Sequence, residues 1–134
     1  MTDAYIFDID GTLAIRGDRS PFNWSKVGLD TVNEPVRKVL DRLEVDFAII
    51  ILSGRDGVCK KETEDWLKLH KIKYEELHMR PENNTEKDSI VKNRIYDDVK
   101  NRYNIVGVFD DRNQVVEMWR SLGLTCFQVA EGNF

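Results

Sequence analysis

The sequence lacks the features of a membrane or secreted protein. Its longest apolar run, residues 47–52, is far too short to cross a bilayer. No charged segment followed by an apolar stretch opens the chain, because Asp8 and Asp10 interrupt the first apolar residues. The two cysteines, Cys59 and Cys126, form neither a close pair nor a metal-binding spacing. We therefore expect no membrane association and a cytoplasmic, reducing setting in which both thiols are structural.

An excess of positive charge is also missing. The 134 residues include 20 Lys and Arg against 24 Asp and Glu, which gives a formal net charge of −4. Proteins that bind long nucleic acids by releasing counterions are usually basic. We therefore expect no extended nucleic-acid groove, although a few local cations can still hold a ligand at one phosphate.

No internal repeat, low-complexity tract or linker divides the chain. Hydrophobic residues make up 41% and charged residues 33%, which is typical of a globular protein. The length suits one domain, residues 1–134, and leaves no room for two.

Hydrophobic spacing predicts strands that alternate with helices. The expected strands are residues 4–8, 47–52, 73–79, 105–109 and 125–129. The expected helices are a segment from Pro35, residues 61–71, residues 85–103 after a capping-box-like Thr85-Glu86-Lys87-Asp88 start, and a segment that ends near Gly123. Residues 13–33 are expected to be an irregular loop or small flap. This order predicts a three-layer α/β fold with a mainly parallel sheet.

Polar residues follow three of the predicted strands. In parallel α/β sheets, ligands bind beyond the carboxyl ends of the strands. The polar groups expected at this edge are Asp8 and Asp10, Ser53 and Arg55, and Asp110 and Asp111.

The segment Asp8-Ile9-Asp10-Gly11-Thr12 places two carboxylates two residues apart after a strand. From a loop, both carboxylates can face one reaction centre. Gly11 permits a tight turn, and the Thr12 hydroxyl can donate to a neighbouring carboxylate. A simple polar turn is the alternative, and the convergence of several polar strand ends disfavours it.

Asp110 and Asp111 end another predicted core strand. Adjacent carboxylates repel each other and raise each other's pKa unless a cation lies between them. An acidic helix start is the alternative. With Asp8 at the same edge, hard oxygen ligands for Mg²⁺ are the better explanation.

Two further segments can bind phosphate. Ser53-Gly54-Arg55 offers a hydroxyl and backbone N–H groups, although a plain Ser-Gly turn is the alternative. Asp88 and Lys92 lie four residues apart on a predicted helix and share a face, with Lys92 toward the sheet. A surface lysine with a local ion pair is the alternative reading of Lys92.

The order and placement of residues 8–12, Ser53, Lys92 and residues 110–111 resemble the four motifs of the haloacid dehalogenase superfamily. The likeness extends over nearly the whole chain. Arg19 and residues 52–55, 87–92, 110–120 and 128–134 are similar to the 3′-phosphatase domain of phage T4-type polynucleotide kinase-phosphatase. This resemblance implies a Rossmann-like fold with little or no cap, and removal of 3′-phosphates from nucleic-acid ends.

The expected mechanism is a phosphoryl transfer through the chain's own carboxylates. Asp8 would attack phosphorus and form an aspartyl-phosphate. Asp10 would protonate the departing 3′-oxygen and then activate water, and a crowd of carboxylates would keep Asp10 protonated at the start. Mg²⁺ would be held by Asp8, the main-chain carbonyl of Asp10, and Asp110 or Asp111.

Ser53 and Lys92 would bind the non-bridging phosphate oxygens. By resemblance, Asp88 would orient a cation, and Arg19 and Arg55 would complete the phosphate site. The alternative for Arg19 is a solvated loop cation. The full set of expected substrate-binding residues is Thr12, Arg19, Gly54, Arg55 and Asp88.

The chain departs from the bifunctional kinase-phosphatases in one large respect. Only seven residues precede Asp8, and no Gly-x-x-x-x-Gly-Lys-Ser/Thr loop occurs, so we expect no kinase domain and no kinase activity. Residues 54–73 also match that family poorly. A phosphatase for a small phosphorylated metabolite is the second hypothesis. A non-catalytic interaction domain is the third, and the intact Asp8, Asp10 and Asp110 argue against it.

Overall fold

Five parallel strands form the central sheet of the computed structural model, which describes residues 1–134. Their order across the sheet is β5–β4–β1–β6–β7. The strands are β1 (Thr2–Phe7), β4 (Ala48–Asp56), β5 (Glu76–Arg80), β6 (Tyr103–Asp110) and β7 (Cys126–Gln128). The predicted α/β class with a parallel sheet is confirmed.

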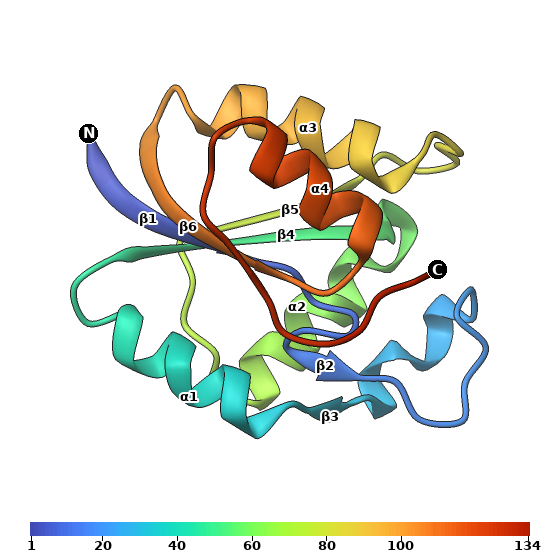
Figure 1. Cartoon of the computed structure of the whole chain (residues 1–134). Coiled ribbons are helices and arrows are strands. Elements are labelled where there is room, and N and C mark those ends of the chain that lie inside the picture. Colours follow the sequence, from blue (N-terminus) through green and yellow to red (C-terminus); the bar gives the residue numbers. More distant parts are fainter.

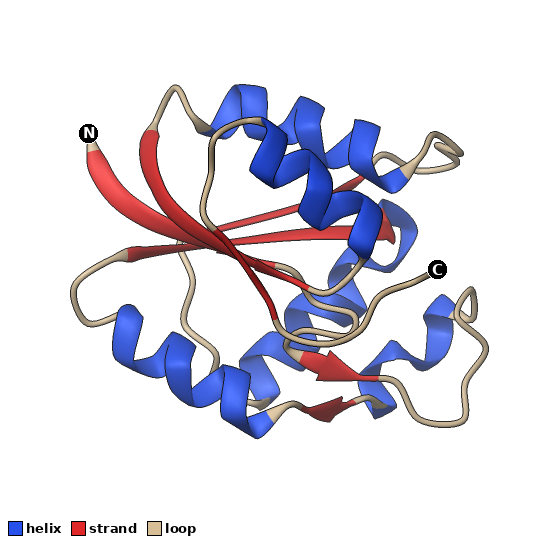
Figure 2. Cartoon of the chain, in the orientation of Figure 1, coloured by secondary structure: helices blue, strands red, loops and turns tan.

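Four helices cover the two faces of this sheet (Figures 1 and 2). They are α1 (Glu34–Leu43), α2 (Lys60–Leu69), α3 (Asp88–Val99) and α4 (Asn113–Ser121). Helices α1 and α2 pack on one face, and α3 and α4 pack on the other. The result is the expected three-layer arrangement.

Strand β4 shows why an unbroken apolar run predicts a central strand. Successive side chains of a strand point to opposite faces. Ile49 and Ile51 therefore join the hydrophobic cluster under α1 and α2, whereas Ile50 and Leu52 join the cluster under α3 and α4. All four side chains are fully buried.

The segment between β1 and α1 is more ordered than the sequence predicts. Residues 13–33 contain the short antiparallel pair β2 (Ala14–Ile15) and β3 (Thr31–Val32), with the 3-10 helix η1 (Trp24–Leu29) between them. A second 3-10 helix, η2 (Gly57–Cys59), precedes α2. The β2–η1–β3 segment lies beside the carboxyl edge of the sheet, near the C-terminus (Figure 1).

Several boundary predictions are wrong: α3 ends at Val99 and not near residue 103, and β5 begins at Glu76 and not at residue 73. The capping box at Thr85 does not form: α3 begins only at Asp88, and Asn84 Oδ1 instead accepts the hydrogen bond of the Glu86 backbone N–H at 3.0 Å. Strand β4 runs on to Asp56, because its pairing with β5 resumes there after an irregularity beyond Ser53. The Ser-Gly turn is therefore not present. No helix is both long enough and apolar enough to cross a membrane.

A core substitution tests the importance of β4 for stability. Ile51→Ala removes a fully buried side chain in the middle of the sheet, so we expect the free energy of unfolding to fall by about 2–5 kcal/mol. Val45→Ala, at an exposed position, should change it by less than about 0.5 kcal/mol. Urea denaturation followed by circular dichroism measures both, and equal effects would contradict the assigned core.

Candidate active site

The sheet topology brings the predicted polar groups together at one edge. Strand β1 lies between β4 and β6, so Asp8, Ser53 and Asp110 end neighbouring strands. The backbone N–H of Asp8 donates to the carbonyl of Phe109 at 3.0 Å, which fixes the end of β1 against β6. Helix α3 adds Lys92 from the face above this edge.

Three buried carboxylates form a cluster that can hold a metal ion. One oxygen from each of Asp8, Asp110 and Asp111 lies within 4.8 Å of the others. The Lys92 ammonium donates to Asp8 at 2.9 Å and to Asp110 at 3.1 Å, and it is itself buried. One positive charge thus faces three carboxylates. The surface-lysine alternative for Lys92 is wrong.

Burial and mutual repulsion shape the protonation of this cluster. Burial, together with the Asp110 carboxylate, raises the pKa of Asp8 well above its usual value. The same two causes raise the pKa of Asp111 to about 6. Burial alone would lower the pKa of Lys92, but the carboxylates of Asp110 and Asp8 outweigh it and raise the pKa. The excess negative charge and hard oxygen donors fit a divalent cation such as Mg²⁺.

The Asp110 carboxylate is held by donors on three sides. Its Oδ2 accepts from Lys92 and from the indole N–H of Trp119 at 3.1 Å, and its Oδ1 accepts from the backbone N–H of Asp111 at 2.8 Å. The sequence places Trp119 on the apolar face of a helix and gives no sign of this polar contact. The indole of Trp119 therefore both fills the core and orients the Asp110 carboxylate.

The turn after β1 fits closely against this cluster. Gly11 has a φ of +81°, and a Cβ atom there would lie 2.0 Å from Asp111 Oδ2, so only glycine is compatible with the turn. The Thr12 hydroxyl donates to Asp8 Oδ2 at 3.2 Å, as expected. The tight turn predicted at Gly11 and the hydrogen bond predicted for Thr12 are therefore both present.

Asp10 points away from the acidic cluster and toward two arginines. Arg55 donates to the Asp10 carboxylate from Nε at 3.0 Å and from Nη2 at 2.8 Å, and Arg19 Nη2 lies at 3.4 Å. The Asp10 side chain stays 41% exposed. The crowd of carboxylates expected around Asp10 is therefore wrong, because its nearest charged neighbours are cations.

Asp30 joins the two arginines and was missed by the sequence analysis. Its buried carboxylate accepts from Arg19 Nε at 2.8 Å and Nη2 at 2.9 Å, and from Arg55 Nη2 at 3.0 Å. The indole of Trp66 donates to its backbone carbonyl at 2.8 Å. Asp30 stands alone in an irregular segment, and no spacing in the sequence connects it to Arg19 or Arg55.

Every guanidinium nitrogen of the two arginines already has a hydrogen-bond partner within the chain. The remaining nitrogen of Arg55 donates to Thr63 Oγ1 at 3.1 Å, and that of Arg19 donates to the carbonyls of Ser20 and Pro21. We expected both to complete the phosphate site. In the structure both contact Asp10 and Asp30, so their part in the phosphate site stays a prediction, whereas the solvated-cation alternative for Arg19 is wrong.

Ser53 and Asp88 lie close to each other in the structure, because Gly54 packs against the Asp88 carboxylate. The Ser53 hydroxyl accepts from the Arg55 backbone N–H at 3.1 Å, so its own proton remains available for a ligand oxygen. A Cβ atom at Gly54 would lie 1.9 Å from Asp88 Oδ1. Asp88 also pairs with Lys92 at 3.6 Å, as the four-residue spacing predicts, and with Arg80 at 3.4 Å.

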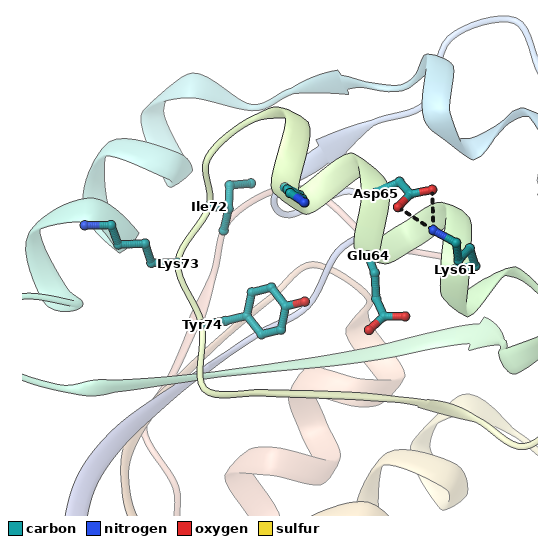
Figure 3. Close-up of a pocket in the computed structure, with 7 residues that line it drawn as sticks. Lys61, Glu64, Asp65, Ile72, Lys73 and Tyr74 are labelled. Carbon is teal, nitrogen blue, oxygen red and sulfur yellow. Dashed lines mark hydrogen bonds and ion pairs between the residues drawn. The ribbon is translucent and has the colours of Figure 1, made fainter.

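A depression lies elsewhere on the surface. It measures about 550 Å³, and its lining residues are Lys61, Glu64, Asp65, Lys68, Ile72, Lys73 and Tyr74. Figure 3 shows these side chains between α2 and the segment before β5, with the Lys61–Asp65 ion pair at 3.0 Å. None of them belongs to the acidic cluster or to the Asp10 group, which consists of Asp10, Arg19, Asp30 and Arg55. The candidate site is therefore the carboxyl edge.

Comparison with known proteins identifies the family. Residues 2–134 match the polynucleotide kinase PNKP phosphatase domain family. The chain belongs to this family. It is thus a phosphatase domain, and the predicted haloacid dehalogenase-type resemblance is confirmed.

Among relatives, a protein of Autographa californica nuclear polyhedrosis virus is 35% identical over 132 residues. It is provisionally named a bifunctional polynucleotide kinase/RNA ligase, and the match covers 94% of this chain but 19% of the viral protein. This chain therefore corresponds to about one fifth of that relative.

Two solved structures share the fold closely. A chain of a Pnkp1/Rnl/Hen1 complex superposes with a TM-score of 0.97 at 39% identity, over 100% of this chain and 48% of that one. A chain of a Pnkp1/Rnl/Hen1 RNA repair complex gives a TM-score of 0.96 at 40% identity, over 99% of this chain and 44% of that one. This chain spans less than half of each.

The acidic cluster predicts a pH-dependent response to Mg²⁺. With an Asp111 pKa of about 6, the folded protein keeps a proton that the unfolded chain releases at lower pH. The metal-free protein should therefore lose stability as the pH rises from about 4 to about 6. Because Mg²⁺ needs the deprotonated carboxylate, Mg²⁺ should raise the Tm more at about pH 7.5 than at about pH 5.

Thermal unfolding with added Mg²⁺ or with chelator measures this response. Asp111→Asn is the informative variant, since it removes one of the two carboxyls with a raised pKa, Asp8 being the other, and should reduce the pH dependence of the Mg²⁺ effect. An equal Tm increase at both pH values in the unaltered protein would contradict the assignment.

The Asp30 network predicts a positioning effect. Asp30→Asn removes the charge between Arg19 and Arg55, so Asp10 loses its fixed orientation, and we expect phosphatase kcat to fall roughly 100-fold. Asp41→Asn, which alters an exposed ion pair with Arg37, is the matched control and should retain activity. Circular dichroism checks the fold, and a wild-type kcat for a folded Asp30→Asn would refute the role.

Proposed function

We propose that this chain removes the 3′-phosphate from nucleic-acid ends through a covalent intermediate on Asp8. The observation that carries the proposal is the buried cluster of Asp8, Asp110 and Asp111 in a chain whose residues 2–134 match a polynucleotide kinase phosphatase domain. The similar chains come from complexes with Rnl and Hen1, one of them an RNA repair complex. This similarity favours RNA ends as substrates.

In the first step the Asp8 carboxylate attacks phosphorus. A carboxylate O–P bond forms while the bond from phosphorus to the 3′-oxygen breaks, and the departing oxygen takes the proton of Asp10. Thr12 and Lys92 each donate to one oxygen of Asp8, so the side chain cannot rotate away from the substrate. These contacts support Asp8 as the nucleophile.

In the second step water cleaves the aspartyl-phosphate. Asp10 accepts a proton from the attacking water, inorganic phosphate forms, and the Asp8 carboxylate is restored. Arg19 and Arg55 keep Asp10 in reach of both the leaving oxygen and the water.

Asp8, Asp110 and Asp111 would hold the divalent cation, together with the Asp10 main-chain carbonyl. Mg²⁺ bound there supplies positive charge that shields the phosphate oxygens from the attacking carboxylate. Ser53 can donate its free hydroxyl proton to a phosphate oxygen. Lys92, held by Asp88, supplies the permanent positive charge at the same place.

A comparison of substrates tests this function. The purified chain with Mg²⁺ should hydrolyse a 3′-phosphorylated oligonucleotide with a higher kcat/KM than a mononucleotide 3′-phosphate or sugar phosphates. Asp8→Asn should abolish all of these activities while the fold survives, since an amide cannot form the acyl phosphate. A preference for sugar phosphates would support the small-metabolite phosphatase instead.

The acid–base role of Asp10 predicts a dependence on the leaving group. Asp10→Asn cannot protonate an alkoxide, whereas an activated phenol leaves with less help, so the oligonucleotide should lose about 100- to 10,000-fold in kcat and nitrophenyl phosphate less. Steady-state kinetics with both substrates measures the difference. Equal losses would argue against general-acid catalysis by Asp10.

A further inference from the structure

Phe22, which is exposed, and Trp24, which is half-buried, form an aromatic pair next to Arg19, one of the two arginines that contact Asp10. Their ring centroids lie 6.2 Å apart with the planes at 90°, the edge-to-face geometry that aromatic pairs favour. Phe22 is 79% exposed. The guanidinium carbon of Arg19 lies 6.0 Å from the centre of the Trp24 ring, so the pair directly adjoins a residue that contacts Asp10.

Arg19 connects this aromatic pair to Asp10 at the carboxyl edge of the sheet. One of its nitrogens contacts Asp10, and another donates to the backbone carbonyls of Ser20 at 3.2 Å and Pro21 at 3.3 Å. Those two residues lead directly into Phe22. The same side chain therefore orients the general acid and anchors the segment that carries the aromatic rings.

We propose that Phe22 and Trp24 are a stacking platform for the nucleobase of the 3′-terminal nucleotide. This inference rests on the proposed function. The leaving oxygen belongs to the terminal sugar and lies on the Asp10 side of the phosphorus, so that sugar and its base extend toward the group that holds Asp10. The Phe22 and Trp24 rings adjoin Arg19, which contacts Asp10, so they are placed to meet that base.

Stacking also fits the charge of the chain. A protein with a net charge of −4 gains little from releasing counterions along a nucleic-acid backbone. Aromatic stacking supplies binding energy without basic residues and accepts any base, because every base has a π-face. The platform thus explains how an acidic domain distinguishes a nucleotide end from a phosphate that lacks a base.

Kinetics with two matched oligonucleotides test the platform. Both carry a 3′-phosphate, and one has an abasic sugar at the terminal position. The wild type should show a KM about tenfold lower for the substrate with the base, and Phe22→Ala or Trp24→Ala should each raise that KM about tenfold, bringing it to the abasic value. Leu29→Ala, an equally exposed apolar position in η1 at 78%, is the control and should change neither KM.

Fluorescence gives a second readout that does not need turnover. The other two tryptophans, Trp66 and Trp119, are buried, so a nucleobase can reach only Trp24. Titration of the Asp8→Asn protein should quench its fluorescence with the oligonucleotide that has a terminal base, and much less with the abasic one.

The outcomes separate this inference from the proposed function. If the wild type hydrolyses the oligonucleotide but shows equal KM values for the two substrates, the platform is refuted and the 3′-phosphatase stands. If the wild type prefers sugar phosphates, the proposed function fails, and the fluorescence titration alone decides the platform: base-dependent quenching supports it and equal or absent quenching refutes it.

Discussion

The buried ammonium group of Lys92 is the interaction on which the catalytic edge depends. It lies between Asp8 at the end of β1 and Asp110 at the end of β6, so it joins two strands and α3 at one point. Without this charge, the carboxylates would be too costly to bury side by side. With the Lys92 charge present, the cluster still has excess negative charge, and this excess attracts a divalent cation.

A second charged group is built around Asp10 and is separate from the first. Asp8 meets a lysine and two other carboxylates, whereas Asp10 meets Arg19 and Arg55, which Asp30 holds in turn. Two carboxylates only two residues apart therefore have opposite surroundings. The proposed division of roles, with Asp8 as nucleophile and Asp10 as acid and base, rests on such a difference.

Local sequence patterns predicted the sheet and most of the acidic edge, because both depend on neighbours in the chain. The apolar run of β4 and the Asp8–Thr12 motif can each be recognised from a few consecutive residues. Asp30 and Trp119 could not be found in this way, since their polar contacts reach residues 25 and 9 positions away across the fold. The Thr85 capping box failed because Asn84 provides the competing side-chain bond.

The two outer strands limit how copies of this domain associate. Strand β7, at one margin of the sheet, has only three residues, so it offers few backbone groups to an incoming strand. Strand β5, at the other margin, carries Glu76, His78 and Arg80 among its five residues. Short or charged outer strands discourage intermolecular β-pairing and the aggregation that follows from it. The same parallel sheet that gathers the polar residues of the carboxyl edge is thereby protected at both of its open sides.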